Sequence, residues 1–262
     1  MRWRLSRWSS AFAIAASVIL TPCVGWGVEG RVLYTRAPGG SRYTGEGDLR
    51  LCELDSTSTL LPHVMIDTEV LSAQFSPDMR RIAYVRLNAS GDEEIVVCDM
   101  DGSNKNVLKT DIAHPSDIRW CVYLCWRMQD KIIYSYDTST NVFAIDPDTG
   151  AESIYYTAQV GFSKVSCSLD GNRLTVRART GYNGVYNIDI AAGQEYEVAG
   201  GCSNWMSPDG TMFTHCTGWT QWTVRNWDAT WSVYGTYDSP EYDKHLAHWS
   251  HNSNDWIIYQ CG

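Results

Sequence analysis

Three histidines within a short segment, residues 245–251, form the part of this sequence closest to a chemical site. The segment reads His-Leu-Ala-His-Trp-Ser-His, and imidazoles are the commonest transition-metal ligands in proteins. The segment favours a strand, in which only side chains two positions apart share a face. His245, His248 and His251 would therefore alternate between faces, so one ion could not readily take all three. We expect no metal here, and His245 and His248 are retained as candidate ligand-binding residues.

The sequence contains none of the common catalytic or cofactor-binding motifs. The sequence lacks Gly-x-Ser-x-Gly, His-Glu-x-x-His, a phosphate loop and a dinucleotide fingerprint. Residues 99–104, Asp-Met-Asp-Gly-Ser-Asn, share the acidic start of a calcium loop but lack its later ligands and distal glutamate. We predict a solvated turn there, and no cofactor and no metal for the chain.

Residues 1–27 have the order of a secretory signal peptide. Arg2, Arg4 and Arg7 precede an apolar run at residues 11–20, and small residues follow. Cleavage after Gly25 or Gly27 would leave residues 28–262 as one exported domain, periplasmic or secreted. A lipoprotein signal ending at Cys23 is the alternative, although proline precedes Cys23 where a small residue is preferred.

The chain is acidic, with a formal net charge of −9. Removal of residues 1–27 takes away three arginines and no acid, so the mature chain would be more acidic still. Such a surface repels phosphate backbones, which disfavours nucleic-acid binding. No second apolar stretch is long enough to cross a membrane, so no transmembrane segment is expected after signal removal.

The sequence has nine cysteines, and an exported chain meets conditions that allow disulfides. Cys202 and Cys216 lie equally far on either side of Asp209. If the two arms of this turn pair symmetrically, the two side chains are direct cross-strand neighbours, and we predict a disulfide between them. Cys52 and Cys98 hold equivalent strand positions and are predicted to be buried thiols.

Two series of turns recur along the chain at a spacing of about 40 residues. Turns of the first series include Ser76-Pro77-Asp78, Ser168-Leu169-Asp170 and Ser207-Pro208-Asp209, and turns of the second series include Asp99–Gly102 and residues 146–150. Short apolar runs rich in Val, Ile, Tyr and Phe separate them, which is typical of strands. Four short strands per repeat predict an all-β propeller, whose units bury their faces by radial stacking.

The repeat resembles that of the TolB-like β-propeller family. The matching residues are Phe75-Ser76-Pro77-Asp78, Ile82-Ala83-Tyr84, Ile95-Val96-Val97, Asp101-Gly102 and Met206-Ser207-Pro208-Asp209-Gly210. The resemblance runs from about residue 30 to the end. The third unit departs from it, because Trp120–Trp126 is longer than usual and Arg127-Met128-Gln129-Asp130 replaces the Ser-Pro-Asp turn. Counting the repeats gives a partial first unit (about 30–68), four full units and a final half-unit (about 244–262), which predicts about six blades with an incomplete or composite closing blade. Because the first unit begins at a second-strand equivalent, we expect its innermost strand to come from elsewhere, in propellers usually the C-terminus.

Both turn series should lie on one face of the disc, and propellers generally bind ligands on the opposite face and in the central channel. The side chains predicted there are Arg86, His114, Asp137, Arg179, Tyr182, Trp219, His245 and His248. We interpret the chain as an exported binding scaffold for a protein partner or an envelope glycan, without catalysis. The alternatives are a polysaccharide lyase or hydrolase that uses channel histidines and acids, and a degenerate repeat protein that works within a larger assembly. The sequence leaves the oligomeric state open.

Overall fold

A computed structural model gives the fold. It describes residues 17–22, 28–36, 47–54, 61–112, 122–136, 139–178, 184–201, 204–216, 221–238, 247–249, 251 and 257–259. All regular secondary structure in these ranges is β-strand. A helix of the length and apolarity needed to cross a membrane does not occur among them.

The first sheet combines two four-stranded antiparallel units. Its strands are β1 (Ser17–Pro22), β2 (Val28–Arg36), β3 (Gly47–Leu54), β4 (Val64–Phe75), β5 (Arg81–Leu87), β6 (Glu93–Asp99) and β7 (Asn106–Ile112), hydrogen-bonded in that order. The long strand β4 joins the units, because its first part pairs with β3 (Leu51 opposite Val64) and its last part with β5 (Phe75 opposite Ile82). We call β1, β2, β3 and the start of β4 unit 1, and the rest unit 2.

The second sheet is built in the same way. Its strands are β8 (Tyr123–Met128), β9 (Lys131–Ser135), β10 (Ser139–Ile145), β11 (Glu152–Cys167), β12 (Arg173–Ala178), β13 (Gly184–Asp189) and β14 (Gln194–Gly200). Here β11 is the shared strand: Ser153 lies opposite Ala144 of β10, and Cys167 lies opposite Leu174 of β12. Unit 3 is therefore β8, β9, β10 and the start of β11, and unit 4 is the remainder.

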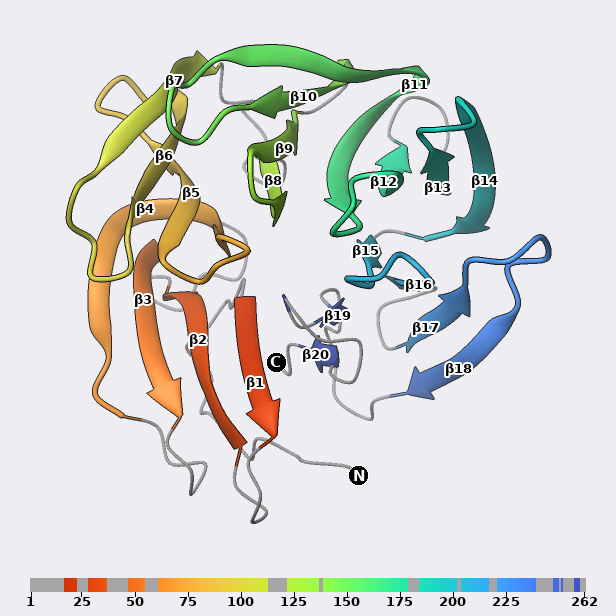
Figure 1. The fold of residues 1–262 in the computed structure, drawn as a ribbon, viewed down its shortest axis with the longest axis horizontal. Coiled ribbons are helices and arrows are strands. Elements are labelled where there is room, and N and C mark those ends of the chain that lie inside the picture. Colours follow the sequence, from red (N-terminus) through yellow and green to blue (C-terminus); the bar gives the residue numbers. More distant parts are fainter. Residues whose placement is uncertain are drawn as a thin grey trace.

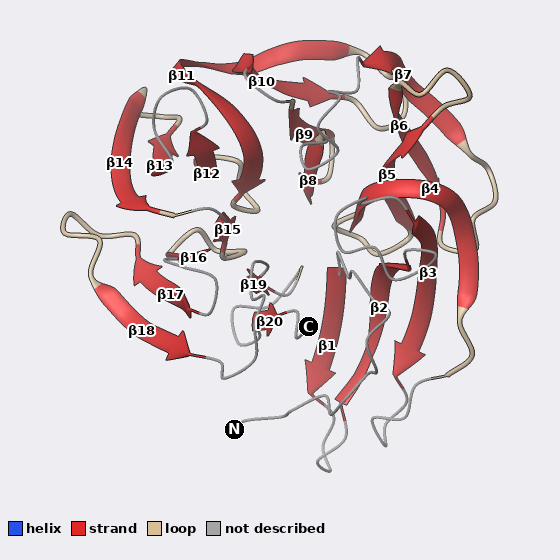
Figure 2. Ribbon diagram, turned by 180° about the vertical axis from the view of Figure 1, so that it is seen from behind, coloured by secondary structure: helices blue, strands red, loops and turns tan. Residues whose placement is uncertain are grey.

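Two smaller sheets follow. Unit 5 consists of β15 (Asn204–Met206), β16 (Met212–Cys216), β17 (Gln221–Asn226) and β18 (Val233–Asp238), and a two-stranded sheet consists of β19 (Ala247–Trp249) and β20 (Ile257–Tyr259). The units stand side by side around a common centre, and the β19–β20 sheet lies between unit 5 and unit 1 (Figures 1 and 2). The arrangement explains the repeat, because each of units 1 to 4 buries apolar side chains against the next unit, and unit 5 buries them against Trp249 of β19.

The innermost strand of unit 1 differs from the sequence-based expectation. β1 occupies this position and pairs with β2 in an antiparallel register, with Ser17 opposite Leu33 and Pro22 opposite Val28. The expectation that a C-terminal strand fills the place is therefore wrong for this structure. β1 lies within the segment whose arginines and apolar run suggested a signal peptide, and its residues Val18, Ile19 and Leu20 suit an inner strand equally well.

The core is a series of apolar layers between units. On β5, Ile82 and Tyr84 pack with Phe75 against unit 1, whereas Ala83 and Val85 pack with Trp126 of unit 3. Successive strand residues point to opposite faces of a sheet, so both faces of unit 2 are buried. The predicted radial stacking is thus confirmed for these units.

The two turn series share one face of the disc, as predicted. In unit 4 the backbone N–H of Ile190, in a second-series turn, donates to the carbonyl of Asn172 in a first-series turn. In unit 5 the N–H of Trp227 donates to the carbonyl of Thr211 in the same way. We call this side the turn face. Because the strands are antiparallel, the turn from β5 to β6 lies on the other side, which we call the loop face.

Candidate functional site

Among the eight predicted ligand-binding residues, Arg86 is the one whose side chain falls within the described part of the chain. His248 lies in β19, where its backbone pairs with that of Ile258. The positions outside the described ranges are His114, Asp137, Arg179, Tyr182, Trp219 and His245. A ligand-binding role for these residues stays a prediction.

Arg86 belongs to an ion network between β4, β5 and β6. Its Nη1 lies 2.8 Å from Asp67 Oδ2 and its Nε lies 2.6 Å from Glu94 Oε1. Asp67 Oδ2 also contacts Lys105 Nζ at 3.0 Å and accepts a 2.5 Å hydrogen bond from the Tyr84 hydroxyl. The Asp67 side chain is only 10% exposed. Arg86 is therefore held by two carboxylates, and a ligand at this position would have to compete with them.

This network makes folding depend on the ionisation of Asp67. Burial alone would raise the pKa of Asp67, but hydrogen bonds from Tyr84, Thr68 and Lys105 and the charge of Arg86 outweigh it and lower the pKa. A carboxyl group whose pKa is lower in the folded than in the unfolded state stabilises the fold above its unfolded pKa of about 4. That stabilisation is lost as the pH falls through the lowered, folded-state pKa.

We expect the free energy of unfolding to decrease as the pH is lowered from 5 to 3, and to decrease less in the Asp67→Asn variant. At pH 7 the variant should be less stable than the wild type by about 1–3 kcal/mol, because it loses charge-assisted hydrogen bonds. Urea unfolding at each pH measures both effects. Parallel pH curves for the two proteins would show that Asp67 does not carry the dependence.

On the turn face, the same hydrogen-bonded serine–aspartate turn recurs in three units. Ser76 Oγ accepts the backbone N–H of Arg81 at 2.9 Å and donates to Asp78 Oδ1 at 2.7 Å. Ser168 with Asp170, and Ser207 with Asp209, make the same pair of contacts. Burial would raise the pKa of Asp78, but the hydrogen bonds from Ser76 and Arg80 lower it. The serine and aspartate of the motif are thus used to close turns.

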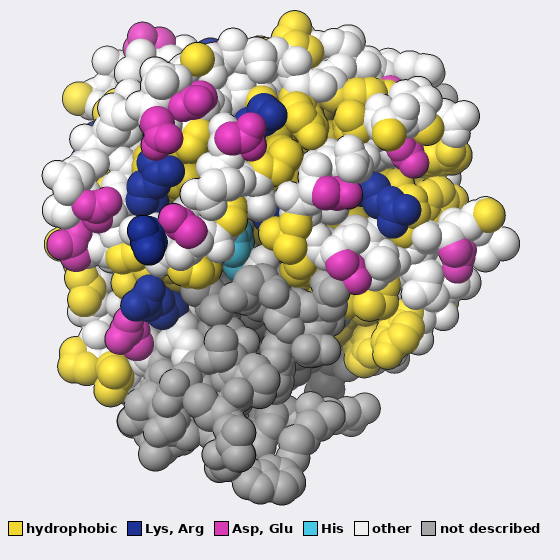
Figure 3. All heavy atoms as spheres, viewed as in Figure 1, with side chains coloured by type: hydrophobic (Ala, Val, Ile, Leu, Met, Phe, Trp, Pro, Cys, Tyr) yellow, Lys and Arg dark blue, Asp and Glu magenta, His cyan; other side chains and the backbone are white. Residues whose placement is uncertain are grey.

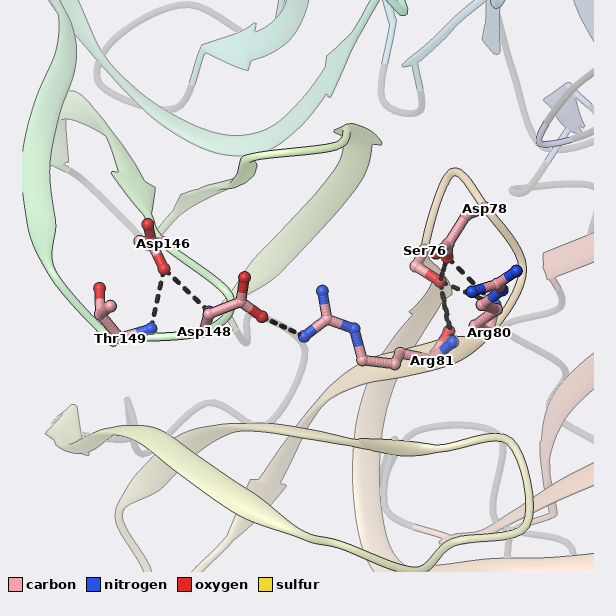
Figure 4. A network of polar contacts seen from close by, with 7 residues as sticks. All are labelled: Ser76, Asp78, Arg80, Arg81, Asp146, Asp148 and Thr149. Carbon is pink, nitrogen blue, oxygen red and sulfur yellow. Dashed lines mark hydrogen bonds and ion pairs between the residues drawn. The ribbon is translucent and has the colours of Figure 1, made fainter.

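An ion pair connects the turn faces of units 2 and 3. Arg81 Nη1 contacts Asp148 Oδ1 at 2.5 Å, and Asp146 accepts the N–H groups of Asp148 and Thr149 (Figure 4). The Arg81 guanidinium also lies 5.1 Å from the centre of the Trp126 ring. Elsewhere on the side seen in Figure 1, basic and acidic side chains alternate (Figure 3). We find no single-sign field among the described residues on this side.

Near the inner strand ends, Arg127 connects three units. It stands at the end of β8 in the position that serine holds in units 2, 4 and 5, and it is 2% exposed. Its Nη1 donates to the carbonyls of Cys167 (3.1 Å) and Met206 (2.7 Å), at the ends of β11 and β15. Burial lowers the pKa of Arg127. Burial and the charge of Arg127 lower the pKa of His251 to about 3, so His251 is neutral at physiological pH and is a poor acid–base candidate.

Beside Arg127, two buried cysteines from adjacent units are in contact. Cys125 Sγ and Cys167 Sγ are 3.2 Å apart, and the backbone N–H of Cys167 lies 3.3 Å from Cys125 Sγ. Burial would raise the pKa of Cys125, but hydrogen bonding with Cys167 and the charge of Arg127 lower it to about 7. The thiol hydrogen bond to Cys125 and burial raise the pKa of Cys167. The contact between Cys125 and Cys167 was not predicted from the sequence, although an alignment of the repeats places both cysteines near the end of an innermost strand.

The symmetric register assumed for Cys202 and Cys216 does not occur. Asn204 pairs with His215 and Met206 with Phe213, so the two arms are offset by one residue from symmetry about Asp209. Cys202 lies outside the described residues, and the bridge stays a prediction without its geometric argument. The prediction for Cys52 and Cys98 is confirmed, since both are buried free thiols.

Aromatic side chains of unit 5 are mostly packing groups. Trp222 is 6% exposed and stacks on Tyr237 with ring centres 4.3 Å apart, as expected for a core position. Trp227 and Trp231 meet edge to face at 5.4 Å. On the outer strand β18, Val233 and Tyr234 are 52% and 66% exposed. Within the described ranges, no three His, Cys, Asp or Glu side chains are arranged to hold a metal ion.

Comparison with known proteins identifies the fold. The chain is similar to TolB from Acinetobacter baumannii (16% identity, TM-score 0.50, covering 77% of this chain and 56% of that one) and to a putative TolB from Agrobacterium tumefaciens (15%, 0.62, 88% and 86%). It is also similar to a chain of a nidogen/laminin complex (12%, 0.56, 80% and 76%). The sequence matches no family model and no curated protein. At these identities the similarity shows a TolB-like propeller fold.

Proposed function

We propose, from the TolB-like propeller fold, that this chain is an exported scaffold that binds a protein partner through its loop face and performs no catalysis. The observation that supports this proposal best is the structural role of the charged side chains in the described core and on the turn face. Arg81, Arg86 and Arg127 each bridge strands or units instead of converging on one point. Acid–base chemistry requires convergent groups, whereas a binding scaffold requires a rigid frame.

The loop face is the surface best suited to recognition. On the turn face, units 2, 4 and 5 are closed by the same serine–aspartate turn, so these turns vary little among the three units. Connections on the opposite face differ in length and composition, and loops on a rigid scaffold carry function more often than the scaffold itself. The solved nidogen/laminin complex, one of the fold neighbours, supports a protein as the ligand class.

We further propose six blades, with the β19–β20 sheet as part of a composite closing blade. Export with cleavage after Gly25 or Gly27 would remove β1 and leave the inner edge of β2 unpaired. An unpaired strand edge invites association, so the mature chain would need another strand in that place. Mass spectrometry of the exported protein would decide between retention and loss of β1.

Affinity capture from a detergent-solubilised envelope fraction tests the proposed function. The full-length gene is expressed with a C-terminal tag, and the tagged protein is recovered with its bound material after mild cross-linking. We expect saturable recovery of a defined protein, reduced by untagged competitor. Recovery of a glycan instead, or turnover of a polysaccharide by the purified protein, would overturn the proposal. Bound metal found by elemental analysis, together with such turnover, would favour the lyase alternative.

A further inference from the structure

The buried contact between Cys125 and Cys167 joins the inner parts of units 3 and 4. Both side chains are fully buried, and both belong to the apolar layer between these units. Their sulfur atoms are 3.2 Å apart, whereas the sulfurs of a disulfide are about 2 Å apart. A movement of about 1 Å, shared between two side chains, would therefore bring them to bonding distance.

The position of Cys167 in the repeat makes this contact unusual. In units 2, 3 and 5 and in the β19–β20 sheet, the corresponding residue near the end of the innermost strand faces the preceding unit. These residues are Phe75, Trp126, Met206 and Trp249. Unit 4 has the much smaller cysteine, with a second cysteine opposite it. The layer between units 3 and 4 therefore has less apolar contact at this point than a large side chain would provide.

The next layer offers a direct comparison. Between units 4 and 5, the backbone N–H of Met206 donates to Ser166 Oγ at 3.0 Å. Between units 3 and 4, the N–H of Cys167 contacts Cys125 Sγ at 3.3 Å in the same way. Cys125 and Ser166 thus hold the same structural position. Only in the layer between units 3 and 4, however, does the facing residue also carry a thiol. The pairing is a property of this one interface.

We infer that Cys125 and Cys167 form a disulfide that joins units 3 and 4 when the chain folds under oxidising conditions. The occurrence of the bond in the cell depends on the proposed export, but its formation can be tested independently of it. The Cys125 thiolate attacks a disulfide of the oxidant, a small-molecule or protein disulfide, and releases one thiolate. The Cys167 thiolate then attacks Cys125 Sγ in the mixed disulfide and releases the second thiolate. The two cysteines lose two electrons and two protons, and the oxidant becomes two thiols.

Burial determines when this exchange takes place. In the folded protein neither sulfur is accessible, so the bond forms before units 3 and 4 close on each other. Once formed, it should resist reduction in the native protein and react readily after denaturation. The disulfide would close a loop of 42 residues. Closing a loop of this size should raise the Tm by roughly 10 °C in a protein of this length.

The test refolds reduced, full-length protein in a mixture of reduced and oxidised glutathione. Free thiols are then alkylated in denaturant without a reductant, and the protein is digested with trypsin and chymotrypsin. Cleavage after Tyr123 separates Cys125 from Cys121, which trypsin alone would leave in one peptide. We expect the Cys125 and Cys167 peptides to be linked, with a mass two hydrogens below that of the separate thiols. Alkylation of both residues, or linkage of either to another cysteine, would overturn the inference.

Thermal unfolding provides a second readout. Reduction in denaturant, followed by refolding without oxidant, should lower the Tm of the wild type. Cys125→Ser and Cys167→Ser should each reduce this difference between oxidised and reduced protein by the same amount, and Cys98→Ser, which removes a buried thiol in unit 2, should leave it unchanged. Equal Tm values for oxidised and reduced wild type would contradict the stabilising role. The peptide map uses the wild type alone, so the inference can be tested even if a variant fails to fold.

Discussion

Replacing Trp126 by alanine is expected to lower the free energy of unfolding by about 3–5 kcal/mol. Trp126 is completely buried and is the largest fully buried side chain among the described residues. It lies in the apolar layer between units 2 and 3, against Ala83, Val85 and Ile132. Truncation would leave a cavity between two rigid sheets, and the Arg81 guanidinium above the ring would lose its aromatic partner.

Urea unfolding followed by circular dichroism measures this effect. Tyr234→Ala is the matched control, because it removes an aromatic side chain that is 66% exposed; the expected change is within about 0.5 kcal/mol. The account predicts one cooperative transition for both proteins, shifted strongly in Trp126→Ala only. A loss below about 1 kcal/mol for Trp126→Ala would mean that the layer between units 2 and 3 is not packed as described.

Replacing Arg127 by alanine should cost about 3 kcal/mol of unfolding free energy. The substitution removes two hydrogen bonds from a guanidinium and leaves the carbonyls of Cys167 and Met206 without this donor. Both carbonyls belong to other units, so the loss would affect three units at once. Burying the guanidinium charge costs free energy in the folded protein, and its removal recovers part of that cost. The net loss of stability is therefore smaller than the sum of the two lost hydrogen bonds.

Arg173→Ala is the matched control for this prediction. Arg173 also donates to a carbonyl of the following unit, that of Gly210 at 2.8 Å, and lies 5.0 Å from the centre of the Trp227 ring, but its side chain is only partly buried. We expect its replacement to cost less than about 1 kcal/mol, because water can take over a surface hydrogen bond. Equal losses for the two variants would show that the buried position of Arg127 has no special structural role.

The repeat pattern predicted most of the fold. Apolar runs between serine–aspartate and aspartate–glycine turns gave the strands, and the turns are local structures whose chemistry is visible in the residues themselves. The same reasoning placed both turn series on one face. It also identified Cys52 and Cys98 as buried thiols, because they hold equivalent strand positions in two repeats.

Features that depend on contacts between units were not predicted. Residues 17–22 resemble a signal segment as much as an inner strand, because a short apolar run suits both. The one-residue offset between β15 and β16 follows from how the turn is hydrogen-bonded, and it moved Cys216 out of its assumed pairing. Arg127 was seen only as a departure from the motif, since its partners lie 40 and 79 residues away. The Arg86 network likewise depends on Asp67 from the preceding strand.

Site-specific photo-cross-linking tests the central claim, binding through the loop face, most directly. A photoreactive phenylalanine derivative is introduced at Ser90, in the exposed β5–β6 turn of the loop face, and separately at Ser103, in the exposed β6–β7 turn of the turn face of the same unit. After irradiation in the envelope fraction, the account predicts a discrete protein adduct from position 90 and none from position 103. Adducts from position 103 alone, equal adducts from both, or none from either would contradict it.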